Sequence, residues 1–163
     1  MKQTVQGIAS GNFFSDAELM HSDTAKKYGI DNTPSPAVWD NLHALRDAIL
    51  NPARLRLGAY ILVNCAYRSK ALNDKLRELG KSPSTTSQHM TGEAADITAG
   101  SVAKNRELFR ILVSLGNFDQ LIWEKGGQWI HVSYKRTGGR AQMLSWNGSK
   151  YININSNWEN AIA

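Results

Sequence analysis

Two short segments of the chain carry side chains that could bind a metal ion. The first, Ser87 to Asp96, reads Ser-Gln-His-Met-Thr-Gly-Glu-Ala-Ala-Asp and places an imidazole at His89 seven residues before the carboxylate of Asp96. The second, Trp-Ile-His-Val-Ser-Tyr at 129–134, adds an imidazole at His131. A catalytic zinc site usually takes three ligands from His, Asp or Glu and keeps the fourth position for water. His89, Asp96 and His131 would complete that ligand set.

The residues between His89 and Asp96 must turn if both side chains are to face one point. Gly92 and the small side chains of Ala94 and Ala95 lie in this connection. Glycine adopts backbone conformations that other residues avoid, and it lets two segments approach closely. The spacing therefore predicts a tight turn at Gly92 that brings the histidine and the aspartate together.

Helical patterns fill the first part of the chain. Ser15 followed by Glu18 has the spacing of a capping box, which predicts a helix over 16–29. From Pro36 onward, apolar residues recur at helical spacing and predict an amphipathic helix whose far end is disturbed by Pro52. We interpret this helix as part of the core.

A strand-to-helix junction follows. The run 59–66 is short and rich in Ile, Val and Tyr, which predicts a buried strand, and 67–69 leads from it into a helix over 70–79. Arg68 then lies at the junction. A further helix is predicted over 105–115, where leucines recur at helical spacing before a glycine.

The last third of the chain predicts β-structure. The runs 118–124 and 128–134 are strand-like and are joined by a glycine turn, which is typical of a hairpin. The runs 142–146 and 151–154 flank an Asn-Gly pair and predict a second hairpin. Helices followed by a small, mostly antiparallel sheet predict an α+β fold with helices on one face of the sheet. We expect one domain over 1–163.

The charge and composition of the chain limit the kinds of partner that it is expected to bind. The formal net charge of +5 and the pI near 9.4 favour an anionic partner, such as nucleic acid, a membrane surface or a cell wall. No basic block or aromatic-basic repeat is present, which disfavours nucleic acid. The single cysteine, Cys65, excludes an internal disulfide and a multi-thiolate zinc cluster, and it is expected in the core.

No apolar run approaches the roughly 20 residues that cross a bilayer, and the N-terminus lacks the apolar stretch of a secretory signal. We therefore expect synthesis in a cytoplasm without membrane insertion, and a monomeric protein.

The motifs resemble the zinc D-alanyl-D-alanine carboxypeptidase family. These cell-wall metallopeptidases include vancomycin-resistance dipeptidases, phage endolysins and, by fold, the hedgehog signalling domain. The resemblance covers nearly the whole chain and is most specific at Ser87-Gln88-His89 with the following Gly92 to Asp96, at Trp129 to Ser133, and at Tyr67-Arg68. The segments 14–19, 29–34 and 118–120 are similar to a phage-type branch of the family.

The resemblance implies roles for these residues. His89, Asp96 and His131 would bind Zn²⁺. Arg68 would donate hydrogen bonds to the substrate carbonyl or to the oxyanion, although a surface salt bridge would also explain an arginine there. Three residues would contact the substrate: Ser87, which could equally cap the turn, Tyr67 and Trp129.

The general base departs from the best-known pattern of the family. That pattern places a Glu three residues before the last histidine, where this chain has Gln128, and an amide cannot abstract a proton. Glu124 is the nearest replacement. Because side chains alternate along a strand, a hairpin loop with an even number of residues would place Glu124 on the face of His131 and turn Gln128 away. Glu93 is the second candidate, although its neighbours' alternation predicts that it points away from the metal.

Three further polar residues receive simpler interpretations. Asp119 could organise the ligand strand or merely begin it. His21 and His43 are expected on the surface of helices rather than as metal ligands.

The resulting hypothesis is a zinc-dependent peptidase that cleaves an amide bond in peptidoglycan stem peptides. D-Ala-D-Ala carboxypeptidase and L-Ala-D-Glu endopeptidase activities both fit the resemblance, and so does a phage or prophage origin with action on the cell wall. The alternative is an inactive, zinc-stabilised binding or structural module in which Gln128 marks a lost base. A nucleic-acid-binding protein is a third hypothesis, supported by net charge alone.

Overall fold

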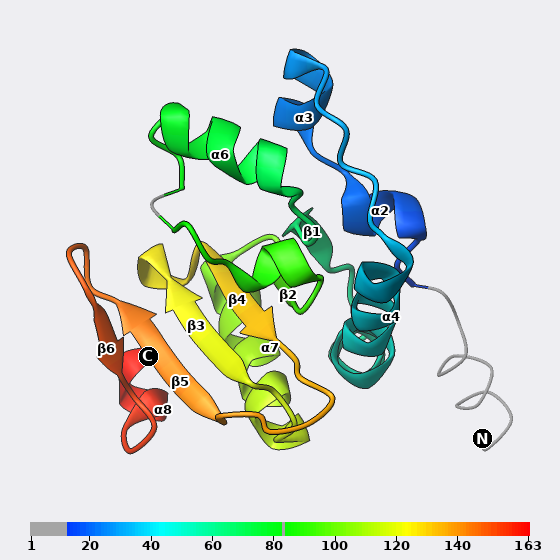
Figure 1. Ribbon diagram of the computed structural model, residues 1–163. Helices are drawn as coiled ribbons and strands as arrows, with labels where there is room; N and C mark the ends of the chain where they lie inside the picture. Colours follow the sequence, from blue (N-terminus) through cyan, green and yellow to red (C-terminus); the bar gives the residue numbers. More distant parts are fainter. Residues whose placement is uncertain (1–12, 83) are drawn as a thin grey trace, which may run out of the picture.

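The computed structural model describes residues 13–82 and 84–163 (Figure 1). Most helices precede the strands, which form a six-stranded sheet in the order β1-β2-β4-β3-β5-β6. The helices are α2 (Asp16–Met20), α3 (Asp23–Tyr28), α4 (Pro36–Leu45), the π-helical η1 (Arg46–Leu50), α5 (Asn51–Leu57), α6 (Lys70–Glu78), α7 (Val102–Leu115) and α8 (Trp158–Ala161), with short 3₁₀ turns η2 (Gln88–Thr91) and η3 (Lys125–Gly127). The strands are β1 (Leu62–Cys65), β2 (Ala94–Thr98), β3 (Gln120–Glu124), β4 (Trp129–Ser133), β5 (Gln142–Trp146) and β6 (Tyr151–Asn153).

The sheet confirms the predicted α+β class. Every neighbouring pair of strands is antiparallel except β3 and β5, which run parallel. In Figure 1, α7 lies behind the sheet and the N-terminal helices gather beyond β1. None of the helices in the described residues is long and apolar enough to cross a bilayer. The N-terminal residues 1–12, on which the prediction about a secretory signal rested, lie outside the described part of the chain.

The two faces of the sheet have different tasks because side chains alternate along each strand. Trp123 on β3 packs edge-to-face against Phe109 of α7, with 5.6 Å between ring centroids. Ile130 on β4 joins the same buried core. Their neighbours Glu124 and His131 therefore point to the opposite face, which α7 leaves uncovered.

The predicted helix over 16–29 is wrong in one respect, since it is two helices. The capping box at Ser15 and Glu18 is present as predicted. The backbone then becomes extended at His21, and the Ser22 side chain accepts a hydrogen bond from the amide of Ala25 to begin a second helix. A second serine cap thus interrupts the helical path.

Pro52 widens its helix without ending it. The helical path continues from α4 through η1 into α5, whose first turn contains Pro52. Proline has no amide hydrogen to donate to the preceding turn. The carbonyl of Ala48 instead accepts a hydrogen bond of 3.1 Å from the Asn117 side chain. The other predicted helices, at 70–79 and 105–115, are confirmed as α6 and α7.

The predicted buried strand over 59–66 is shorter and less buried than expected. It is β1, which lies at the edge of the sheet and pairs with β2 alone. Leu62 is 46% exposed and burial alternates along the strand. An apolar composition could not distinguish an edge strand from a central one, because only the pairing of distant segments decides it.

Gly92 makes the tight approach that the sequence predicted. Its φ angle of +74° lies in the left-handed region, and a Cβ atom added there would lie 2.7 Å from the carbonyl oxygen of Val38 in α4. The residue both ends η2 and lets this turn rest against α4. A side chain at this position would displace the segment that joins His89 to Asp96.

We predict that Gly92→Ala lowers the free energy of unfolding by about 2–5 kcal/mol, since it adds overpacking to an unfavourable backbone conformation. Gly58→Ala is the matched control, because Gly58 has a φ of +65° with no atom within 4 Å of its added Cβ. The control should lose about 1 kcal/mol. Urea unfolding of both variants measures the difference, and equal losses would show that the contact with Val38 contributes nothing.

Candidate metal centre

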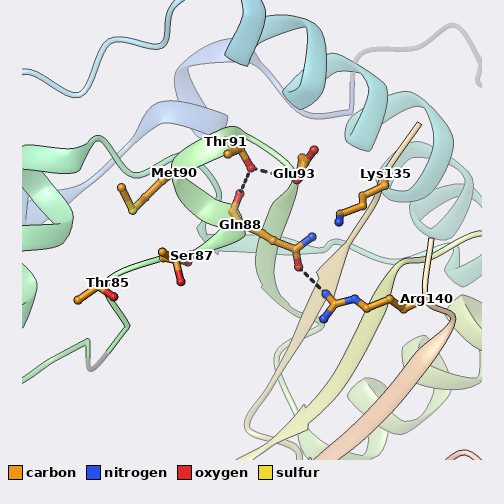
Figure 2. Close-up of a pocket in the computed structure, with 9 residues that line it drawn as sticks. Thr85, Ser87, Gln88, Met90, Thr91, Glu93, Lys135 and Arg140 are labelled. Atoms are coloured by element: carbon orange, nitrogen blue, oxygen red, sulfur yellow. Dashed lines mark hydrogen bonds between the residues drawn. The ribbon is translucent and has the colours of Figure 1, made fainter. Parts of the chain in front are cut away.

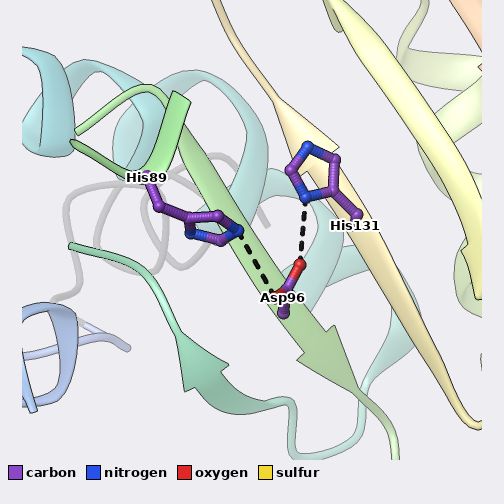
Figure 3. Close-up of side chains that lie close together, drawn as sticks. All are labelled: His89, Asp96 and His131. Atoms are coloured by element: carbon purple, nitrogen blue, oxygen red, sulfur yellow. Dashed lines mark hydrogen bonds and ion pairs between the residues drawn. The ribbon is translucent and has the colours of Figure 1, made fainter. Parts of the chain in front are cut away.

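Asp96 lies between two imidazoles (Figure 3). It is the register partner of His131 on the adjacent strand β4, so both side chains point to the same face of the sheet. Its Oδ1 lies 3.0 Å from Nδ1 of His131, and its Oδ2 lies 3.3 Å from Nε2 of His89. One ligand atom from each residue lies within 4.8 Å of the other two. The predicted ligand set is thus brought together by the fold.

His89 is oriented by the chain that precedes the helix α6. Its Nδ1 lies 2.8 Å from the carbonyl oxygen of Ala66. A carbonyl can only accept, so Nδ1 carries a hydrogen and Nε2 is the nitrogen that faces Asp96, where it either donates to the carboxylate or, without its hydrogen, can bind a metal. Metal-binding histidines commonly have their second nitrogen fixed in this way. The donor set, two nitrogens and one carboxylate oxygen, fits Zn²⁺.

Charge concentrates at this cluster. Burial would raise the pKa of the Asp96 carboxyl, but the charge of His89 and hydrogen bonds from both histidines hold that pKa well below its ordinary value. Burial opposes protonation of His89, yet the nearby Asp96 carboxylate raises the pKa of His89 well above its ordinary value. The anion therefore requires positive charge beside it, which either protons or a metal cation can supply.

The three candidate ligands face a cavity whose wall includes Glu124 and Trp129. These two residues are paired across the β3–β4 hairpin, and Ile122 is paired with His131. The intervening loop has four residues, so the parity condition for Glu124 is met and its side chain is diagonal to His131 on one face. We call this cavity, which His89, Asp96 and His131 also line, the metal cavity.

Glu124 is only 8% exposed, and its Oε1 accepts a hydrogen bond of 3.1 Å from the Tyr151 hydroxyl. Burial raises the pKa of the Glu124 carboxyl, although the Tyr151 hydrogen bond partly opposes this. Gln128 lies at the exposed end of the hairpin loop, and the metal cavity is not lined by it. The Glu124 carboxylate therefore faces the three candidate ligands. The amide of Gln128, which occupies the usual position of the family's base, does not line the cavity.

The sequence model of the peptidase M15 family matches residues 12–133. The chain belongs to the peptidase M15 family. Among solved structures, this M15 peptidase is similar to the L-Ala D-Glu endopeptidase ChiX of Serratia marcescens, with 16% sequence identity and a TM-score of 0.46 over 63% of this chain and 89% of that one. The curated proteins contain no match to the sequence.

A second cavity adjoins the metal cavity in this M15 peptidase (Figure 2). Ser87, Gln88 and Arg140 line both spaces, and Lys135 lines only the second. Ser87 also accepts a hydrogen bond from the backbone amide of His89, so it caps the turn while it faces the cavities. Glu93, the second candidate for the base, lines this adjoining cavity rather than the metal cavity.

Tyr67 and Arg68 lie in different environments. Tyr67 belongs to the hydrophobic core, and Arg68 lies at the junction between β1 and α6. Tyr67 is 8% exposed and packs in the hydrophobic core, and it does not line the metal cavity. Arg68 makes no salt bridge among the described residues, so the ion-pair interpretation is wrong; its Nη1 donates to Asn73 and Ser82. Its buried Nε has no hydrogen-bond partner in the described part of the chain.

Several residues that contribute to the site had no role there in the sequence analysis. Asn32 accepts a hydrogen bond of 2.7 Å from the amide of Ser69 and so fixes the Arg68 junction. Cys65 is half-buried, with Sγ 3.8 Å from Nδ1 of His89, instead of lying in the core as expected. Arg140 follows the second motif by six residues and Tyr151 lies in the predicted second hairpin, but no local pattern assigns either of them a role at the site.

Asp119 organises both ligand segments at once. It is fully buried and accepts hydrogen bonds from Gln88, which precedes His89, and from Ser133 on the His131 strand. Arg140 forms an ion pair with it at 2.7 Å. Hydrogen bonds from Arg140 hold the pKa of Asp119 well below its ordinary value. The two surface histidines behave as expected, since His21 pairs with Asp23 and His43 with Asp16.

We predict that Asp119→Asn lowers the free energy of unfolding at pH 7 by about 1–3 kcal/mol. Because the folded-state pKa of Asp119 is lowered, its stabilisation is complete above the unfolded value of about 3.9 and is lost as the pH falls through the folded value. The difference from wild type should therefore shrink below about pH 4.

The measurement is urea unfolding from pH 7 to pH 2 with a chelator present. Asp74→Asn is the control, since it breaks an exposed pair with Lys70 and should change stability by under about 1 kcal/mol. A difference for Asp119→Asn that stays constant with pH would contradict the assignment.

Proposed function

We propose that this M15 peptidase hydrolyses an amide bond in the stem peptide of peptidoglycan, with zinc bound by His89, Asp96 and His131. The observation that carries the proposal is the position of Glu124, a largely buried carboxylate in the wall of the cavity into which the three ligands point. A metal cluster with an acceptor for a proton beside it is the equipment of a hydrolase.

Each group has a distinct task in this proposal. When bound, zinc supplies a Lewis acid that polarises a carbonyl oxygen and makes water more acidic. Glu124 accepts the proton of the attacking water and passes it to the leaving amine. Its raised pKa suits this exchange, because a general base works best with a pKa near the operating pH.

Arg68 is the proposed electrophilic partner. A guanidinium keeps its charge at every relevant pH and can donate to an oxyanion in a fixed geometry. The Arg68 amide donates to the carbonyl oxygen of His89 at 3.0 Å, and its Nη2 approaches Cys65 beside the cluster. The Arg68 side chain does not line the metal cavity, and its buried Nε is the one donor of the guanidinium in the described residues that is left without a partner. Substrate contacts are proposed for Ser87 and Trp129.

The adjoining cavity supports an internal bond as the target. A carboxypeptidase that removes one terminal residue needs little room beyond the scissile bond, whereas an endopeptidase must hold peptide on both sides. Ser87 and Gln88 stand between the two cavities, and the second cavity has Lys135 available for a carboxylate. We therefore favour the L-Ala-D-Glu endopeptidase type over the D-Ala-D-Ala carboxypeptidase type.

The basic surface suits an anionic cell wall, and the resemblance to phage-type relatives supports a phage or prophage protein that acts there as a monomer. The second candidate is a zinc-stabilised binding module without turnover. Gln128 favours it, since it stands at the position where the best-known relatives have their base.

We predict that zinc-loaded wild type releases new amines from purified peptidoglycan and that Glu124→Gln loses this activity by about 10²–10⁴-fold while it still binds one zinc. His131→Ala should lose both zinc and activity. Glu107→Gln, an exposed carboxylate on α7 behind the sheet, is the control and should match wild type.

Amine release and zinc content are measured on the same samples. Full activity in Glu124→Gln would move the base to another carboxylate, with Glu93 tested next. Zinc-loaded wild type that leaves walls and stem-peptide fragments intact from pH 6 to 9 would refute the enzyme and favour the binding module.

We predict that mass spectrometry of the products from a defined stem peptide finds a new amino terminus at D-Glu. Truncation of the substrate to the dipeptide L-Ala-D-Glu should reduce kcat/KM at least tenfold, because contacts remote from the scissile bond contribute to its cleavage. D-Ala-D-Ala, which lacks that bond, should not be cleaved. Free D-alanine as the main product would identify the carboxypeptidase type instead.

A further inference from the structure

The C-terminal hairpin completes the metal cavity, although it lies beyond residue 133, where the family match ends. It comprises β5 and β6, which turn at residues 147–150. β5 pairs in parallel with β3, the strand that ends at Glu124. This pairing joins segments from different parts of the chain, so the hairpin reaches the site only in the folded molecule (Figure 1).

The register of the hairpin decides which of its side chains face the metal cavity. Leu144 pairs with Ile122, whose side chain lies on the face of His131. Two residues further, Trp146 shares this face and pairs with Tyr151 on β6. Leu144, Trp146 and Tyr151 all line the metal cavity, in agreement with the register.

Tyr151 reaches across β5 to Glu124. Its ring lies against Trp146, with 4.8 Å between centroids and an interplanar angle of 56°. Tyr151 is 48% exposed to solvent, but its hydroxyl lies 3.1 Å from Oε1 of Glu124. Among the described residues, no other hydrogen bond to the Glu124 carboxylate is formed. The orientation of this carboxylate therefore depends on one donor.

We propose that Tyr151 is a positioning residue that holds Oε1 of Glu124 and leaves Oε2 to accept the proton of the attacking water. This inference rests on the proposed role of Glu124 as the base. A carboxylate at the end of a strand can rotate about its terminal torsion, and a single fixed hydrogen bond selects one orientation. Trp146 limits the tyrosine in turn, so the donor itself is held by packing.

Tyr151 acts as a donor and not as an acid. Burial and the Glu124 charge raise the pKa of its hydroxyl to about 12, so it keeps its proton throughout the range in which Glu124 titrates. The charged and titratable groups that line the metal cavity with Glu124 are Asp96 on β2, His131 on β4, His89, Lys81, Arg140, Lys125 in the adjoining loop and Tyr151. In the described part of the chain, the tyrosine alone donates a hydrogen bond to the carboxylate, and this bond favours the ionised form.

The test is Tyr151→Phe, which removes the hydroxyl and keeps the ring against Trp146. We expect kcat to fall about tenfold with KM and zinc content unchanged, and the acidic limb of the kcat/KM profile to move up by about one pH unit, because a hydrogen bond to an ionised carboxylate lowers its pKa. Tyr60→Phe is the matched control; Tyr60 is 62% exposed just before β1, and its variant should match wild type.

A double variant separates positioning from a general structural effect. In the Glu124→Gln background, Tyr151→Phe should reduce the residual rate no further, since the group that it positions is gone. A second full tenfold loss there would overturn the inference, and so would a rise in KM with kcat unchanged, which would make Tyr151 a substrate contact.

The failure of this inference is distinguishable from failure of the proposed function. Wild type that is active, together with Tyr151→Phe of identical kcat and pH profile, would overturn the role of Tyr151 and leave the peptidase standing. Zinc-loaded wild type without turnover would overturn the base itself. As an independent measurement, carboxyl ¹³C NMR of the zinc-loaded protein should show a higher pKa for Glu124 in Tyr151→Phe than in wild type, and equal values would refute the coupling.

Discussion

The Asp96 carboxylate, shared between two imidazoles on the central part of the sheet, is the group on which the arrangement of the cavity depends. A buried anion is costly unless it is paired, so the fold must bring both histidines to it or bind a cation there. The pairing of Asp96 with His131 is a register contact between β2 and β4. A slip of one residue in β2 or β4 would turn Asp96 or His131 to the α7 face, so the site forms only in this register of the sheet.

His89 is held from two directions because it comes from a turn rather than a strand. On one side, the Ala66 carbonyl accepts a hydrogen bond from the His89 ring, and the Arg68 amide donates one to the His89 carbonyl. Asn32 fixes this same junction through the amide of Ser69. On the other side, the buried Asp119 accepts a hydrogen bond from Gln88, the residue before His89. Segments far apart in sequence thus share the task of fixing one imidazole, which explains why the N-terminal helices matter to a site that none of their side chains enters.

Much of this site was predictable because its key relations are local. The alternation of side chains and the length of one hairpin loop placed Glu124 on the face of His131, and the glycine at 92 marked the tight turn. Other features could not be predicted because they depend on pairing between distant segments. The edge position of β1, the ion pair of Arg140 and the reach of Tyr151 all depend on which strands become neighbours, and no spacing within a motif contains that information.

The two carboxylates on the open face of the sheet have opposite electrostatic environments. Asp96 lies between two imidazoles, which hold its pKa low and favour its ionised form. Glu124 is also largely buried, but its one hydrogen-bond donor within residues 13–82 and 84–163 is a neutral phenol, so desolvation dominates and its pKa rises. Environments that separate the pKa values of neighbouring acids also separate their roles, one as a fixed charge and the other as a group that exchanges protons. Gln128 is therefore compatible with the proposed peptidase activity, in which the desolvated carboxylate of Glu124 on β3 takes the part of the base.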